Sequence, residues 1–116
     1  MALTSINPAT GEQVAEFEEH SVDEVERRLG IAGEAFRDWS ARPVSERAAV
    51  LSRMADLLDT EHEALGRLMT LEMGKTLLAA TSEARKCASG CRFYAENAGD
   101  IIAAMPIERD GVRHGA

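Results

Sequence analysis

Two cysteines and a glycine-lysine-threonine sequence are the residues of this chain that most readily suggest chemistry. Cys87 and Cys91 are four residues apart, so on a helix both thiols would lie on one face, where they could bind a metal or react together. The histidines lie in other segments, and none has a cysteine at zinc-site spacing: His20, His62 and His114. Both cysteines fall on an apolar stripe, where cysteine packs as a small hydrophobic residue. We therefore predict that both are buried in the core, which disfavours an autonomous enzyme that uses either thiol.

Gly74-Lys75-Thr76 resembles the end of a phosphate-binding loop, in which glycine amides and a lysine surround the phosphates. That motif needs another glycine five residues before Gly74, where this chain has Met69, and it needs a preceding strand where the periodicity indicates a helix. A helix that ends at Gly74 and another that begins at Thr76 explain the same residues. The chain also lacks the G-x-G-x-x-G sequence that binds a dinucleotide pyrophosphate.

The charges of the chain favour solvated helix surfaces over a catalytic carboxylate pair. Glu18-Glu19 and Glu61-x-Glu63 lie among other charges, whereas catalytic carboxylates need a desolvated cleft that separates their pKa values. There are 13 basic and 20 acidic residues, and the net charge of −7 disfavours binding to nucleic acid or anionic lipid. The first residues do not resemble a signal peptide and no apolar stretch approaches the ~20 residues that cross a bilayer, so we expect no membrane association and a cytoplasmic location.

The elements that would position these residues begin with a β-hairpin over residues 1–19. Two short segments of strand-like composition flank the turn-forming residues 7–12, which include proline and glycine. Such a hairpin is marginally stable alone, so we expect it to lie on the following helices or on another chain.

About four helices are predicted over residues 20–105, and the fold class is therefore mainly α. The capping-box pair Ser21 and Glu24 begins the first helix, and Pro43 ends it. A second helix starts near Ser45, and a second capping box at Thr60 and Glu63 predicts a break before the third.

The longest periodic segment runs from Thr76 to about Ala104 and predicts one long helix. Gly90 lies inside it at a cost of about 1 kcal/mol relative to alanine. A close neighbouring backbone at Gly90 would explain why this glycine is tolerated. Residues 106–116 show no periodicity and are predicted to be a frayed tail.

Several short sequences resemble, in order and spacing, the amino-terminal part of the aldehyde dehydrogenase family. The likeness covers residues 5 to about 105 and comprises Ile6-Asn7-Pro8-Ala9-Thr10-Gly11-Glu12, Ala35-Phe36 with Trp39, Arg47 with Leu51, Ala55-Asp56-Leu57-Leu58, Leu71-Glu72-Met73-Gly74-Lys75 and Phe93-Tyr94-Ala95-Glu96-Asn97-Ala98. The last two sequences look most like the succinate-semialdehyde dehydrogenase branch. The resemblance implies that this chain is a fragment of the α/β cofactor-binding domain, with the hairpin and the helical layer packed beside a nucleotide-binding sheet.

The resemblance also implies an activity for the full-length family, namely oxidation of an aldehyde to its acid through a cysteine thiolate, with hydride transfer to NAD or NADP. The nucleophile, the cofactor-binding strands and the general-base glutamate of the family follow later in its sequences, and neither cysteine here has the nucleophile's context. We therefore expect no catalytic residue and no bound cofactor in this chain alone, and we expect its role to be scaffolding.

One site is carried over from the family by resemblance. Glu83 aligns with a carboxylate that in some relatives helps to bind a monovalent cation together with backbone carbonyls, here near Ser5 and Ile6. Oxygen ligands suit such a hard ion. The alternative is that Glu83 is a solvated side chain on the polar face of a helix.

Helices that normally cover a sheet expose apolar faces when the sheet is absent. We therefore expect exposed apolar surface, and partners that are the remainder of the aldehyde dehydrogenase fold, a homologous subunit or a second copy of the chain. The alternative function is a helical interaction module that docks on a full-length aldehyde dehydrogenase.

Overall fold

The structure is a computed structural model that describes residues 2–104, 107–109 and 112–114. It begins with the predicted hairpin, in which β1 (Ala2–Ile6) pairs with β2 (Gln13–Glu18) in antiparallel register. The side chain of Asn7 accepts a hydrogen bond from the Ala9 amide at 2.9 Å, and Gly11 adopts a φ of 75°. The turn therefore follows from local chemistry, because asparagine side chains stabilise such turns and glycine tolerates positive φ.

Helix α1 (Val22–Ala41) begins and ends where the sequence predicts. The Ser21 hydroxyl accepts a hydrogen bond from the Glu24 amide at 3.2 Å, and Asp23 and Glu24 place negative charge in the first turn. No residue of this helix is buried. Its apolar face is therefore open to solvent.

Helix α2 (Val44–Met73) is continuous, so the predicted break at Thr60 is wrong and the described residues form three helices rather than about four. The Thr60 hydroxyl donates to the Asp56 carbonyl at 2.8 Å, one turn earlier, instead of accepting from the Glu63 amide. A threonine inside a helix commonly makes this bond, and the capping-box pattern does not distinguish the two cases. Gly74 ends α2 with a φ of 70°, as predicted.

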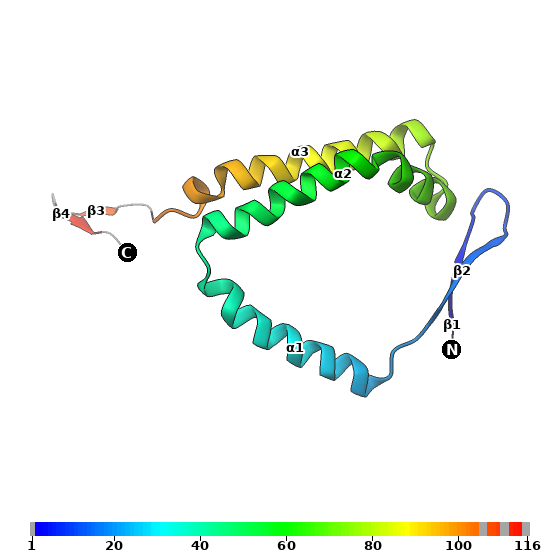
Figure 1. Cartoon of the computed structure of the whole chain (residues 1–116), viewed down its shortest axis with the longest axis horizontal. Coiled ribbons are helices and arrows are strands. Elements are labelled where there is room, and N and C mark those ends of the chain that lie inside the picture. The colour runs from blue at the N-terminus through cyan, green and yellow to red at the C-terminus, as the bar shows by residue number, and fades with distance from the viewer. Residues whose placement is uncertain (1, 105–106, 110–111, 115–116) are drawn as a thin grey trace.

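Helices α2 and α3 (Leu77–Ile101) form an antiparallel hairpin, visible in green and yellow in Figure 1. The buried hydrophobic residues among those described are small: Ala55, Ala80, Ala84 and Ala88. Gly66 is buried on the same seam, where a Cβ would lie 2.5 Å from Thr81 Cγ2. Small side chains therefore let the two helices approach closely.

The expectation of a close backbone at Gly90 is wrong, because nothing lies within 4 Å of the position its Cβ would take. The periodicity of α3 shows that Gly90 is helical but not which side of the helix has a neighbour. Gly66, which the sequence analysis did not single out, has the close neighbour instead.

Beyond α3, β3 (Ile107–Arg109) pairs antiparallel with β4 (Val112–His114), whereas the sequence predicted no regular element in this segment. Strands of three residues are too short for an alternating pattern to be recognised in a sequence. The proposed boundary between residues 105 and 106 lies outside the described residues.

The arrangement is open rather than closed around one core. Figure 1 shows α1 apart from the α2–α3 hairpin, and α1 is not among the pairs of elements that make extensive contact. The radius of gyration is 20.7 Å, compared with about 13 Å for a compact domain of this length. Large apolar side chains are exposed on all three helices, for example Leu29, Phe36, Leu57 and Leu78.

Candidate functional site

The two cysteines are free thiols on α3. Cys87 is exposed and Cys91 is partly exposed, so the prediction that both are buried in the core is wrong. Cys87 lines an apolar groove between α2 and α3 with Leu58, Leu65 and Leu68. Cys87 lies on the apolar side of α3, as predicted, but no other segment in the described part of the chain covers that side at Cys87. No cluster of three or more metal-binding side chains of histidine, cysteine, aspartate or glutamate occurs among the described residues.

Gly74-Lys75-Thr76 is a helix-to-helix connection and not a phosphate site. The Thr76 hydroxyl accepts from the Ala79 amide at 3.3 Å and so caps α3. The Lys75 ammonium forms an ion pair with the Glu83 carboxylate. The lysine that would contact a phosphate is thus engaged within the chain, and the residues of this connection do not fit the phosphates of a dinucleotide.

Glu83 and Ile6, the residues proposed for a monovalent cation, lie in different elements. Glu83 lies on α3 and forms an ion pair with Lys75, whereas Ile6 ends β1. The Lys75 ammonium thus neutralises the charge of the Glu83 carboxylate. The cation site at Glu83 and Ile6 remains a prediction based on the family resemblance.

The hairpin is attached to the end of α2 by two contacts. The Ser5 hydroxyl donates to the Glu72 carboxylate at 2.9 Å. A Cβ on Gly74 would lie 2.9 Å from Pro8 Cγ, so the turn of the hairpin packs closely on this helix end. The expected position of the hairpin on the helices is therefore observed.

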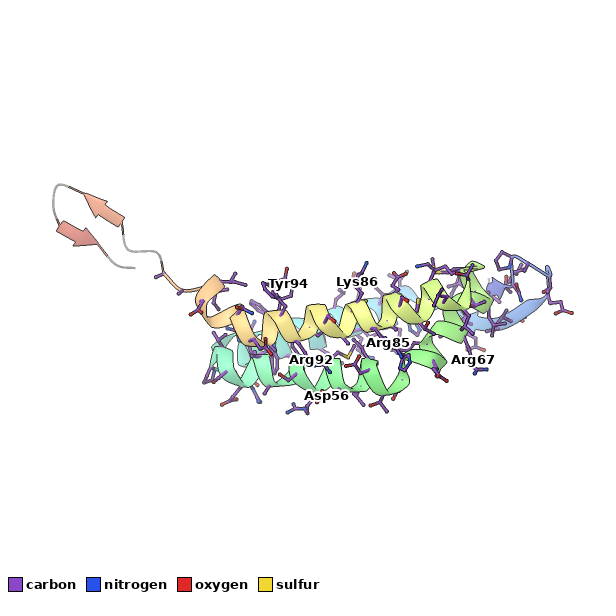
Figure 2. The ribbon with its side chains drawn as sticks, turned by 90° about the horizontal axis from the view of Figure 1, so that it is seen from above. Asp56, Arg67, Arg85, Lys86, Arg92 and Tyr94 are labelled. Carbon is purple, nitrogen blue, oxygen red and sulfur yellow. The ribbon has the colours of Figure 1, made fainter. Side chains whose placement is uncertain are left out.

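An ionic cluster joins α2 to α3 near the middle of the helical hairpin. The Arg92 guanidinium on α3 donates to Asp56 at 3.3 Å and to Asp59, both on α2. Asp59 first, and then Asp56, raises the pKa of Arg92 above its ordinary value. Figure 2 shows Arg92 and Asp56 along the line where the two helices meet.

A second polar contact lies about two turns from this cluster. Arg85 donates to Nε2 of His62 at 2.8 Å, and the other ring nitrogen of His62 is 2.7 Å from the Asp59 carbonyl oxygen. The ring nitrogen facing the carbonyl must therefore carry the proton, which leaves Nε2 as the acceptor. Arg67, Glu63 and Leu78 complete an open groove of about 390 Å³ around this contact.

These polar contacts between helices were not predicted from the sequence, although the spacing contained a signal. Arg85 and Arg92 are seven residues apart, and Asp56 and Asp59 are three apart, so each pair shares a helix face. Opposite charges on the facing sides of adjacent helices favour such a cluster. The pattern predicts it only when the pairing of the two helices is already known.

The sequence and structure both match one family of known proteins. Residues 1–112 match the model of the aldehyde dehydrogenase family. The chain is 44% identical over 108 residues to "Succinate-semialdehyde dehydrogenase (NADP(+)) 1" of Mycobacterium tuberculosis, a match that covers 93% of this chain and 24% of that protein. A probable succinate-semialdehyde dehydrogenase (NADP(+)) of Synechocystis is 41% identical over 110 residues, which is 95% of this chain and 24% of the relative.

A solved structure gives the same result for the fold. Succinic semialdehyde dehydrogenase from Streptococcus pyogenes, in complex with NADP+, superimposes with a TM-score of 0.88 at 26% sequence identity. The match covers 95% of this chain and 24% of that chain. The hairpin and helices therefore have the arrangement of an aldehyde dehydrogenase segment.

This chain belongs to the aldehyde dehydrogenase family, and the predicted resemblance is confirmed. It spans about a quarter of the length of the curated relatives that it matches. Relatives at 41–44% identity are named as succinate-semialdehyde dehydrogenases, in agreement with the predicted branch. None of the helices in the described ranges is long and apolar enough to cross a membrane.

Proposed function

We propose that this chain forms the hairpin and helical layer of the cofactor-binding domain of an aldehyde dehydrogenase that oxidises succinate semialdehyde to succinate with NADP. The observation that carries the proposal is the identity of 41–44%, over more than nine-tenths of this chain, to proteins named as NADP-dependent succinate-semialdehyde dehydrogenases. When bound, the nicotinamide cofactor accepts the hydride. No step of that reaction is assigned to the described residues.

The role proposed for the chain itself is scaffolding. Its buried seam consists of alanines and one glycine, whereas its large apolar side chains face outward, including Phe36 at 67% and Leu78 at 80% exposure. Such an arrangement suits a layer that is covered by another part of a larger fold. The ionic contacts between α2 and α3 stabilise the pairing of these two helices.

A chimera tests this proposal. Residues 1–112 of this chain replace the matching segment of the Mycobacterium tuberculosis relative, and oxidation of succinate semialdehyde is followed as NADPH formation. We expect an active enzyme, because the segment supplies the scaffold and the relative supplies the remaining residues. A folded chimera without activity would contradict the proposal.

Cys87→Ser and Cys91→Ser in the same chimera serve as matched controls. Both variants should retain activity, because both thiols are free and neither belongs to a metal-binding cluster among the described residues. Loss of activity in either variant, with the fold intact, would restore the hypothesis that one of these cysteines is catalytic.

The alternative, a helical interaction module that docks on an intact relative, is favoured by one observation, the exposed apolar face of α1, on which no residue is buried. Mixing the chain with the intact Mycobacterium tuberculosis relative and measuring co-elution separates the two proposals. A complex at micromolar concentration would favour docking, and its absence would exclude it.

A further inference from the structure

A groove of about 310 Å³ lies where the end of α1, the start of α2 and the end of α3 come together. Arg47 is the charged residue of its lining, which is otherwise apolar and includes Trp39, Val44, Leu51, Ala98 and Ile102. Trp39 is 41% exposed and Ile102 is 58% exposed, so the groove is open to solvent. We call it the Arg47 groove.

Arg47 carries a buried donor that has no acceptor. Its Nε atom is buried, yet none of the described residues accepts a hydrogen bond from it. The adjacent carboxylate, Glu46, lies instead 3.8 Å from the Arg42 guanidinium, which also lies over the Trp39 ring at 5.7 Å from its centroid. A buried donor on a cation is costly when unsatisfied, and native folds supply an acceptor for nearly all such groups.

We propose that the Arg47 groove receives an apolar segment of the remaining aldehyde dehydrogenase fold, and that a carboxylate on this segment accepts the hydrogen bond from Arg47 Nε. A guanidinium in an apolar setting is matched best by a carboxylate, because the hydrogen bonds are charge-assisted and the two groups are geometrically complementary. The relatives extend well beyond the matched segment, which is 24% of their length, so the same fold can supply the partner. The identity of this occupant rests on the proposed function, whereas the preference for an apolar carboxylate rests on the groove alone.

The preference can be measured on the chain as it is, because Trp39 is its only tryptophan and lines the groove. Hexanoate and hexanol are titrated separately while the tryptophan fluorescence is recorded. We expect half-saturation by hexanoate at a concentration about tenfold lower than by hexanol, the ratio that one charge-assisted hydrogen bond produces. Equal half-saturation by the two compounds would overturn the proposal.

Two substitutions on α2 show whether the preference comes from Arg47. Arg47→Met keeps an apolar stem and removes the donor, so the two compounds should bind within about twofold of each other. Arg53→Met removes an exposed cation outside the groove and should leave the tenfold ratio intact. The same loss in both variants would mean that net charge, and not the Arg47 Nε donor, determines the preference.

The chimera identifies the occupant. Phenylglyoxal modifies accessible arginines, and peptide mapping reports the rate at each one. If a segment of the remaining fold fills the groove, Arg47 should react at least about tenfold more slowly in the chimera than in the chain alone. Equal rates would show that the groove stays open and would overturn this occupant. A folded but inactive chimera would contradict the proposed function, while the hexanoate preference of the chain would still test the chemistry of the groove.

Discussion

Arg92 links α3 to two aspartates of α2, Asp56 and Asp59. Because the small residues of the seam provide limited apolar burial, ionic contacts across it should contribute measurably to the pairing of the helices.

Arg92→Gln should therefore lower the midpoint of thermal unfolding by roughly 2–5 °C, because Asp56 and Asp59 lose their shared partner. Circular dichroism at 222 nm measures the midpoint. Arg53→Gln is the matched control, since Arg53 is an exposed arginine on α2 that forms no ion pair within the described part of the chain, and it should leave the midpoint unchanged. An unchanged midpoint in Arg92→Gln would show that the cluster does not stabilise the helix pair.

At the start of α1, the Glu24 carboxylate accepts hydrogen bonds from Arg27 and Arg28, each at 2.7 Å. Arg27 first, and then Arg28, lowers the pKa of Glu24 from 4.5 to about 2. A lowered pKa in the folded state means that the stabilisation is present above pH 4.5 and is lost as the pH falls toward 2.

Titration of the Glu24 side-chain carboxyl carbon by NMR should give a midpoint near 2 in the folded chain. Arg27→Gln should raise this midpoint toward 4.5, because Arg27 is the larger cause of the shift. A midpoint that is already 4.5 in the unsubstituted chain would contradict the pairing seen in the structure.

The sequence alone predicted the roles of residues whose hydrogen-bond partners lie within a few positions along the chain. Ser21, Gly74 and Thr76 have the predicted capping roles because each acts on backbone within a few positions. It was insufficient for Cys87, since periodicity identifies an apolar stripe but not whether another surface covers it. The orphaned Arg47 Nε likewise depends on tertiary placement, although Arg47 was among the residues that carried the family resemblance.

Among the elements, α2 and α3 each contain an interior glycine, Gly66 and Gly90, and the space around the two residues differs. A Cβ at Gly66 would lie 2.5 Å from Thr81 Cγ2 and 3.0 Å from the Thr81 amide nitrogen, which is backbone and cannot rotate away. A Cβ at Gly90 would meet nothing within 4 Å. The first glycine thus reflects helix packing, whereas the packing around the second does not require glycine.

Gly66→Ala should reduce the free energy of unfolding by about 1–3 kcal/mol, because the helices must separate to admit the methyl group. Gly90→Ala should increase it by up to about 1 kcal/mol through helix propensity alone. Urea denaturation followed by circular dichroism measures both. Equal effects of the two substitutions would contradict the close approach at Gly66.

Element boundaries were predicted well, but the number of helices was not. The hairpin, the start of α1 and the connection at residues 74–76 agree with the sequence analysis, since caps and turn residues determine them. The error at Thr60 arose because its hydroxyl can either cap a new helix or bond back to the preceding turn. Which of these occurs is decided by the packing of α2 along α3.

In the molecule as a whole, the described residues form a layer rather than a closed domain. Family membership explains this shape, because the chain spans about a quarter of the length of its relatives. The sequence contains more apolar helix faces than surfaces that could cover them, and so predicted that some would be exposed. The structure shows exposed apolar side chains on α1, α2 and α3. The separation of α1 from the helical hairpin is a tertiary feature that no local pattern reports.

These apolar faces are suited to being covered by another part of a larger fold and are open to solvent in the chain by itself. Fluorescence of an apolar-surface dye with the purified 116-residue chain tests this claim most directly, with a compact native protein of similar size as the control. We expect several-fold stronger dye fluorescence than for the control, together with a broad thermal transition. Fluorescence at the level of the control, with a sharp cooperative melt, would contradict the account.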